Sequence, residues 1–321
     1  LQFSVCQADC IDDDPDANDT LTLVGVTDPQ DGTVVLNPDN TLTYDPAGAF
    51  EYLGVGETAT TTVVYTVSDD DGATATAQVI FTINGENDDP TANPDVTTTS
   101  EDDAVNIPVL DNDTDPDVND ELNVCGIEVG GVMVTPTPGV PVTLDSGGRV
   151  VLLVDGTIDY TPPASANALD AGESLVDVFT YKIDDGNGGT ATATTTVTVT
   201  GEDDPTVTNP DVDVTDEDTA IVVDVLANDS DPDTTDNPLS VTNVVQPPAG
   251  QGSVINNGNN VTFDPGSDFQ DLAVGETEIV NFTYDATTPD GDTTTENVTI
   301  TVVGTNDDPV ANPDGETTPE N

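Results

Sequence analysis

The stretch Ser174-Leu-Val-Asp-Val-Phe-Thr-Tyr-Lys-Ile183, continued by Asp184-Asp-Gly-Asn-Gly-Gly189 and Thr190-Ala-Thr-Ala-Thr-Thr-Thr-Val-Thr-Val199, decides the fold class. Both flanks are rich in β-branched residues, and apolar residues alternate with polar ones as in a half-buried strand. The acidic, glycine-rich middle is typical of a turn. The sequence therefore predicts an antiparallel hairpin.

The same hairpin pattern recurs along the chain. Thr61 to Ser68 and Thr74 to Ile83 flank the turn Asp69-Asp-Asp-Gly72. Three tyrosines each lie eight residues after a Gly-Glu pair, at Tyr65, Tyr181 and Tyr284. The repeat length of about 100 to 115 residues suits whole domains in tandem. No segment longer than one turn shows a helical period, so we predict an all-β fold of tandem immunoglobulin-like β-sandwiches.

Domain boundaries are placed at recurring acidic linkers, aligned on their prolines as Asn87-Asp-Asp-Pro90, Glu202-Asp-Asp-Pro205 and Asn306-Asp-Asp-Pro309. They divide the chain into a first repeat, 1–86, which lacks its opening strand, a second repeat, 87–201, and a third repeat, 202–304. Residues 305–321 are predicted to be the opening strand of a next repeat, or a donor strand for a neighbouring subunit. Tail and head together make one nearly complete copy, which favours a head-to-tail filament or one segment of a longer array.

The charge of the chain restricts its partners. Sixty-four acids against two bases, Arg149 and Lys182, give a formal net charge of −62. Such a charge opposes compaction unless cations offset it, and it disfavours nucleic acid and anionic membranes as partners. No apolar run reaches the roughly 18 residues of a membrane helix. A halophile's solvated surface is an alternative source of the acids, and it predicts acids spread evenly over exposed faces.

The ordered motifs carry a family resemblance. Gly-Glu-Asn-Asp-Asp-Pro (85–90), Asn-Asp-Thr-Asp-Pro-Asp (112–117), Leu-x-x-Gly-Glu and Tyr-x-x-Asp-Asp-Gly resemble the VCBS-type and cadherin-like immunoglobulin repeats of large bacterial surface (RTX-type) adhesins. The resemblance covers essentially the whole chain. It implies a secreted or cell-surface β-sandwich stalk whose domain junctions bind Ca²⁺.

Carboxylates two residues apart mark the candidate metal sites. They recur in Asp12-Asp-Asp-Pro-Asp16, Asp111-Asn-Asp-Thr-Asp-Pro-Asp117 and Asn228-Asp-Ser-Asp-Pro-Asp233. An extended backbone would direct them to one side, roughly 6 to 7 Å apart. Two carboxylates about 4 Å apart repel by roughly 4 kcal/mol at an effective dielectric near 20, so such a row favours a cation. Oxygen ligands of this kind suit Ca²⁺.

The candidate ligands are grouped by junction. The first junction has Asn87, Asp88, Asp89, Glu101, Asp102, Asp113, Asp115 and Asp117. The second has Glu202, Asp203, Asp204, Glu217, Asp218, Asp229, Asp231 and Asp233. Outer candidates are Asp12, Asp14, Asp16, Asn306, Asp307 and Asp308. Each junction list exceeds the six to eight oxygens of one calcium, so either two ions share a junction or some acids are solvated. Solvated turn residues are the alternative, and for the hairpin acids Asp69, Asp71, Asp184 and Asp185 that interpretation is preferred.

The sequence offers no constellation for catalysis. It has no His, no Gly-x-Ser-x-Gly and no phosphate-binding loop, and its carboxylates lie in turns of repeated modules rather than across a cleft. We therefore predict a non-enzymatic extracellular structural protein. The alternative is an adhesin module that recognises a glycan or a cell-surface protein through the longer region from Gly130 to Val151, which carries Arg149.

Overall fold

The structure is a computed structural model that describes residues 2–4, 12, 14–16, 19–309, 311 and 313–317. It forms two compact units, one of residues 1–98, 104–161 and 176–198, and the other of residues 99–103, 162–175 and 199–321. The junction between the first and second repeats therefore lies inside one unit. The junction between the second and third repeats lies inside the other.

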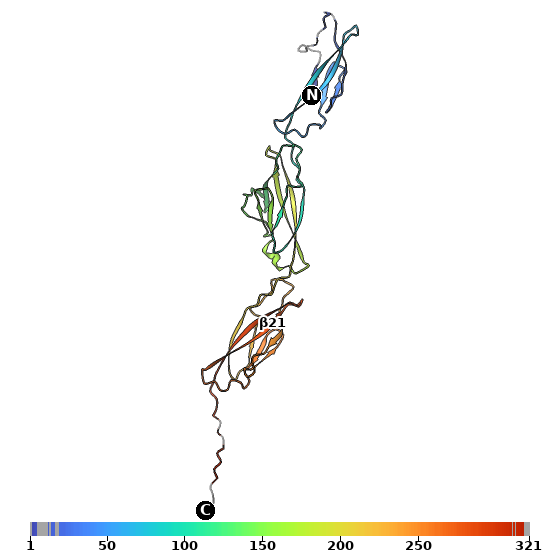
Figure 1. Ribbon diagram of the computed structural model, residues 1–321. Helices are drawn as coiled ribbons and strands as arrows, with labels where there is room; N and C mark the ends of the chain where they lie inside the picture. The colour runs from blue at the N-terminus through green and yellow to red at the C-terminus, as the bar shows by residue number, and fades with distance from the viewer. Residues whose placement is uncertain are drawn as a thin grey trace, which may run out of the picture. The chain divides into compact units, whose positions relative to one another are not determined.

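The first repeat is formed by two sheets. One contains β1 (Gln2–Ser4), β4 (Thr41–Asp45) and β3 (Thr33–Leu36), and the other β2 (Thr22–Val26), β5 (Thr58–Ser68) and β6 (Thr74–Asn84). Figure 1 draws these strands in blue. Alternate residues of β5 face the core, where Val63 is fully buried and Tyr44 stacks on Phe81 at 4.6 Å between ring centroids. The sandwich results from this two-residue period.

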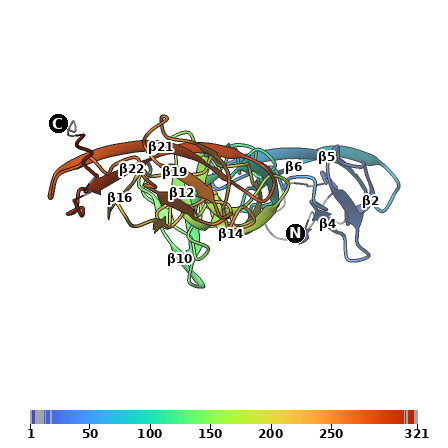
Figure 2. The same ribbon diagram turned by 90° about the horizontal axis from the view of Figure 1, so that it is seen from below.

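The second repeat has a five-stranded and a four-stranded sheet. The first runs β10 (Val132–Val134), β9 (Asn123–Val129), β14 (Ser174–Asp184), β15 (Thr190–Thr200) and β7 (Asp95–Ser100). The second runs β11 (Val142–Thr143), β12 (Arg149–Leu152), β13 (Ile158–Thr161) and β8 (Val105–Ile107). A 3-10 turn, η1, spans Ala164–Ala168. The hairpin that ends in β10 stands out from the neighbouring strands in Figure 2.

The third repeat repeats the sandwich without a β10 equivalent among its described strands. Its sheets are β16 (Asp211–Asp216), β22 (Thr293–Val303), β21 (Thr277–Thr287) and β18 (Ser240–Val245), and β17 (Ile221–Val223), β20 (Val261–Asp264) and β19 (Ser253–Asn256). Its core centres on Phe263, Phe269 and Tyr284, each fully buried. The all-β prediction is confirmed, and so is the hairpin from Ser174 to Thr200. Among the described residues, no helix is long and apolar enough to cross a membrane.

Tyrosine hydroxyls close the same corner in each repeat. The Tyr181 hydroxyl donates to the carbonyl oxygen of Val109 at 2.9 Å, and the Tyr284 hydroxyl donates to that of Val225 at 2.8 Å. In the first repeat the Tyr65 hydroxyl donates to the Asp12 carboxylate at 2.6 Å. Each bond ties the long hairpin to the acidic segment that opens the repeat, and so fixes where the following Asp-Pro-Asp lies.

Candidate metal centres

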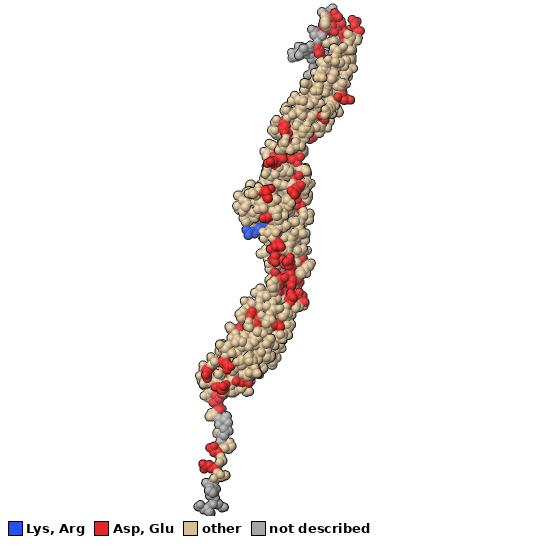
Figure 3. All heavy atoms as spheres, in the orientation of Figure 1, with Lys and Arg blue, Asp and Glu red and all other residues tan. Residues whose placement is uncertain are grey.

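Acidic side chains converge at the start of every repeat. In three groups, one carboxylate oxygen from each residue lies within 4.8 Å of the others: Asp14, Asp19 and Asp69 in the first repeat, Asp115, Asp120 and Asp185 in the second, and Asp203, Asp290 and Asp292 in the third. On the face shown in Figure 3, acidic side chains gather in compact patches with wide uncharged areas between them. This distribution favours specific acid clusters over an evenly solvated surface.

The first junction joins the linker to the opening segment and the hairpin turn of the second repeat. The backbone N–H of Asp88 donates to Oδ2 of Asp117 at 2.9 Å, and Nδ2 of Asn87 donates to Oδ2 of Asp185 at 2.9 Å. Asn187 donates to both oxygens of Asp120. Three buried oxygens have no hydrogen-bond partner, namely Oδ1 of Asn87, Oδ2 of Asp115 and Oδ1 of Asp117.

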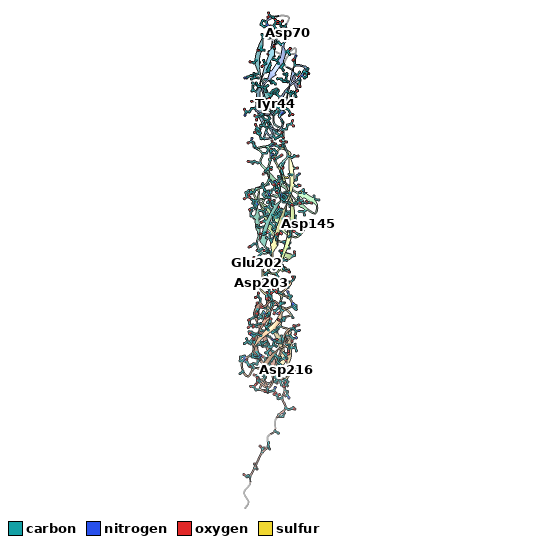
Figure 4. The ribbon with its side chains drawn as sticks, turned by 90° about the vertical axis from the view of Figure 1, so that its right-hand side faces the viewer. Tyr44, Asp70, Asp145, Glu202, Asp203 and Asp216 are labelled. Carbon is teal, nitrogen blue, oxygen red and sulfur yellow. The ribbon has the colours of Figure 1, made fainter. Side chains whose placement is uncertain are left out.

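The second junction repeats this arrangement with more carboxylates. The backbone N–H of Asp204 donates to Oδ2 of Asp233 at 2.8 Å. Two further groups with oxygens within 4.8 Å overlap here: Asp170, Asp203, Asp233 and Asp236, and Glu101, Asp204 and Asp233. Glu101, Asp233 and Asp236 each keep one buried oxygen without a hydrogen-bond partner. Figure 4 labels Glu202 and Asp203 next to each other in this linker.

Burial and mutual repulsion shift the acidities of the clustered acids. Burial, and then the charges of Asp290 and Asp170 among others, raises the pKa of Asp236 to about 6. A hydrogen bond with Asp292, and then burial, raises the pKa of Asp203 to about 6. Burial also raises the pKa of Asp115, Glu101 and Asp233. Like charges held this close destabilise the ionised forms, and a cation removes that destabilisation.

Asp185 is the exception at the first junction. Burial alone would raise the pKa of its carboxyl group, but hydrogen bonds from Asn87 and from the backbone N–H groups of Asn187, Gly188 and Gly189 outweigh burial and lower it. The sequence analysis treated Asp185 as a solvated turn residue. The structure shows it buried and within the cluster of Asp115 and Asp120.

Glu101 and Glu217 lie at different junctions from those assigned from sequence. Oε1 of Glu101 accepts the backbone N–H of Glu202 at 2.8 Å, so Glu101 belongs with the second linker rather than the first. Oε1 of Glu217 accepts the N–H of Thr305 at 2.6 Å, so Glu217 belongs with the third linker. The reason is strand direction: β16 pairs in parallel with β22 over its whole length, from Asp211 opposite Val298 to Asp216 opposite Val303. Figure 4 accordingly shows Asp203 and Asp216 at opposite ends of the third repeat.

The exposed neighbours of these glutamates, Asp102 and Asp218, are assigned to the same junctions as the glutamates. Asp102 is exposed. Burial, and then the charge of Asp102, raises the pKa of Asp204, so Asp102 too belongs to the second junction. Asp218 is exposed and accepts the Thr305 hydroxyl at 3.2 Å. Asn306 donates to the carbonyl oxygen of Asp307, and Asn306, Asp307 and Asp308 join no acid cluster within the described part of the chain.

Asp113 and Asp229 face the tyrosine corner instead of the clusters. Asp113 accepts the backbone N–H of Asn93 at 2.7 Å, and Asp229 accepts that of Asn209 at 2.9 Å and the Tyr284 hydroxyl at 2.5 Å. The expectation that all carboxylates of this stretch point to one side is therefore wrong. The segment forms turns rather than an extended strand, so successive side chains diverge.

The correspondence between the linkers also differs from the proline-based alignment. The donors to Asp117 and Asp233 are Asp88 and Asp204, which pairs Asn87 with Asp203 and Glu86 with Glu202. The anchors are Gly85 and Gly201, because a Cβ there would lie 2.2 Å from the Leu53 carbonyl oxygen and 2.3 Å from that of Asp170, respectively. Glu202 and Asp89 are exposed and lie outside the acid clusters.

Sequence reasoning missed several clustered acids. Asp19, Asp120 and Asp236 each lie three residues after an Asp-Pro-Asp stretch, and this recurrence is visible in the sequence. Asp170 and Asp292 have no acidic equivalents in the other repeats, and Asp290 has its equivalent in Asp71 of the first hairpin turn. Only folding brings these three acids to the second junction.

The residues fit a hard divalent cation. The clusters offer carboxylate oxygens, the amide oxygen of Asn87 lies at the first junction, and buried oxygens at both junctions lack a hydrogen-bond donor among the described residues. A buried ionised oxygen without a partner is costly, whereas Ca²⁺ takes six to eight such ligands. The chain holds only two basic residues that could otherwise neutralise these acids.

Two family models match the chain. The bacterial cadherin-like domain matches residues 2–85 and 87–201, and the bacterial Ig domain matches residues 202–301. No curated protein matches it. Solved structures that match this chain include mouse protocadherin-24 EC1-3 (17% identity, TM-score 0.44, covering 88% of this chain and 90% of that one). Another is mouse cadherin-23 EC22-24 (15% identity, TM-score 0.43, covering 91% and 89%, respectively).

Proposed function

The chain belongs to the bacterial cadherin-like domain family, and from this premise we propose that it is a non-enzymatic, calcium-stabilised segment of an extracellular filament or adhesin stalk. Bacterial cadherin-like and Ig domains indicate an extracellular adhesion or structural role, and they are typically non-enzymatic modules. The proposal adds that Ca²⁺ binds at the junctions between repeats and stiffens the linkers there.

The observation that carries the calcium part is a set of buried oxygens without donors at both junctions. Oδ1 of Asp117 belongs to a side chain that is 1% exposed, and Oδ1 of Asp233 to one that is 0% exposed. Each lies beside a linker whose backbone N–H already occupies the other carboxylate oxygen. A cation is the partner that satisfies the remaining oxygen and offsets the repulsion of the neighbouring acids.

Cation binding would couple successive repeats. At the second junction Glu101 and Asp170 come from the second repeat, whereas Asp233 and Asp236 come from the third. Interdomain motion is the default where interfaces are small and polar, so ligands drawn from both sides would restrict it. The proposed role of Ca²⁺ is therefore to stiffen the linkers rather than to take part in a reaction.

Two further acidic sites lie at the outer ends of the described repeats. Asp14, Asp19 and Asp69 cluster in the first repeat, and Glu217 keeps its buried Oε2 without a partner beside Thr305. In the proposed function each is completed by a matching repeat, supplied by a flanking segment or by a second copy in a head-to-tail contact.

Small-angle scattering tests the proposal. With millimolar Ca²⁺ the chain should show a longer maximum dimension and a narrower distribution of shapes than with EGTA. An identical profile in both conditions contradicts the calcium part. High monovalent salt is the control, because equal stiffening by salt alone indicates that the acids serve solvation.

A ligand-binding adhesin module is the second candidate. Among the described repeats, the second alone carries the added strands β10 and β11. Within its acid-free stretch 129–144, the β10 residues Val132, Met133 and Val134 are exposed. Arg149 on β12 is an exposed base in the same region. Binding to a glycan array that is lost in an Arg149→Ala variant would support this role. If the chain binds no glycan, the stalk role is favoured.

A further inference from the structure

We propose that the two junctions are unequal, with the second binding Ca²⁺ more tightly and filling at lower concentration than the first, because Asp170 occupies the position that Gly54 holds at the first junction. The inference rests on the proposed calcium function. It concerns which linker stiffens first, and it names the residue pair that sets the order.

Gly54 and Asp170 occupy the same place in two equivalent backbones. Each follows the leucine of a Leu-x-x-Gly-Glu segment, at Leu53 and Leu169. The N–H of Gly85 donates to the carbonyl oxygen of Glu57 at 2.9 Å, and the N–H of Gly201 donates to that of Glu173 at 3.0 Å. The same close approach of the linker glycine to this segment occurs at both junctions. The scaffold is therefore the same, and the side chain is what differs.

Asp170 contributes a carboxylate that the first junction lacks. Its oxygen lies within 4.8 Å of those of Asp203, Asp233 and Asp236, and its Oδ2 also accepts the Thr235 hydroxyl at 2.5 Å. At the first junction, Gly54 lies close to the equivalent acids Asp117 and Asp120. A Cβ at Gly54 would lie 3.4 Å from Oδ1 of Asp120 and 3.5 Å from Cβ of Asp117.

A second difference adds to the first. The linker residue equivalent to Asp203 is Asn87, which is neutral. Its Nδ2 donates a hydrogen bond to Oδ2 of Asp185 at 2.9 Å. Asp203 is a carboxylate shared between the group with Asp170 and the group with Asp290 and Asp292. The second junction thus brings three overlapping acid groups together, whereas one such group lies at the first within the described residues.

Ligand charge sets calcium affinity, so the junction richer in carboxylates should fill first. At intermediate Ca²⁺ the second linker would be held while the first still flexes. The chain would then stiffen in two steps, with its first junction acting as a hinge that stays flexible until the Ca²⁺ concentration is higher.

Hydrogen exchange of the full chain over a Ca²⁺ titration tests this, because peptides over 86–91 and 202–207 report each linker separately. In the unmodified chain the second linker should gain protection at a Ca²⁺ concentration about tenfold lower than the first. Gly54→Asp should shift the first midpoint down, and Asp170→Gly should shift the second up, each by about tenfold and without moving the other linker.

Matched controls separate charge from fold. Gly54→Asn adds the same bulk without the charge and should leave the first midpoint within about twofold of the parent, and Asp28→Asn removes an exposed acid outside the clusters and should move neither midpoint. Equal midpoints that neither swap moves overturn the inference while the calcium function stands. If neither linker gains protection at any Ca²⁺ concentration, the proposed function itself is wrong.

Discussion

The backbone N–H of Asp204 donates to the carboxylate of Asp233 at 2.8 Å, across 29 residues of sequence. The bond orients the linker toward the opening segment of the third repeat. Oδ1 of Asp233, fully buried, is left without a donor. This half-satisfied carboxylate is the feature from which the calcium hypothesis follows.

Asp233→Asn should have opposite effects with and without Ca²⁺. In EGTA the variant removes a buried charge beside like charges, so the free energy of unfolding of the third repeat should rise or stay level. With saturating Ca²⁺ it should fall below the parent by roughly 2 to 3 kcal/mol, because a charged ligand is lost. Urea unfolding in both conditions measures the two differences. A variant that is weaker by the same amount in both would mark Asp233 as structural only.

Asp236→Asn should change the pH dependence of the calcium-free chain. The folded-state pKa of Asp236 is raised to about 6 from 3.8, mainly by burial, so the folded state binds its proton more tightly than the unfolded state does. Stability from this group is therefore highest at low pH and is lost as the pH rises from about 4 to about 6. The stability difference between parent and variant should shrink or reverse over that window. A difference that grows in favour of the parent with rising pH contradicts the assignment.

Glu101→Gln should affect the second linker and spare the first. Glu101 is buried, and its Oε1 accepts the N–H of Glu202. Hydrogen exchange with Ca²⁺ should show lost protection at 202–207 and parent-like protection at 86–91. The assignment made from sequence predicts the reverse, so one measurement decides between them.

Tyr284→Phe should destabilise the third repeat by about 1 to 3 kcal/mol whether or not Ca²⁺ is present, since it removes the hydroxyl that donates to the carbonyl oxygen of Val225 and to Oδ2 of Asp229. Urea unfolding in EGTA and in Ca²⁺ checks the size and its independence from the cation. Asp229→Asn is the companion variant. It should leave the calcium midpoint of the second linker unchanged. A large shift of that midpoint would indicate that Asp229 is a calcium ligand after all.

The exposed, acid-free edge strand β10 is a candidate binding surface that the composition of the chain does not reveal. Val132 and Met133 are exposed on β10, which pairs with β9 alone among the described strands. Sequence reasoning singled out this region for its length and for Arg149, but its strand pairing depends on Gly130 and Gly131, both with positive φ, at the hairpin turn. Such an edge is visible only once the sheet order is known.

The sequence by itself determined the all-β class, the regular spacing of the tyrosines and the Asp-Pro-Asp stretches, because alternation, turn residues and fixed spacing are local properties of the chain. Tertiary structure alone decided which acids meet. The parallel pairing of β16 with β22 carries Glu217 to the far end of its repeat, and close packing at Gly85 and Gly201 sets the register of each linker. Strand direction and glycine packing depend on partners distant in sequence, so no local pattern contains the junction to which Glu101 belongs, or the acids that Asp170 meets there.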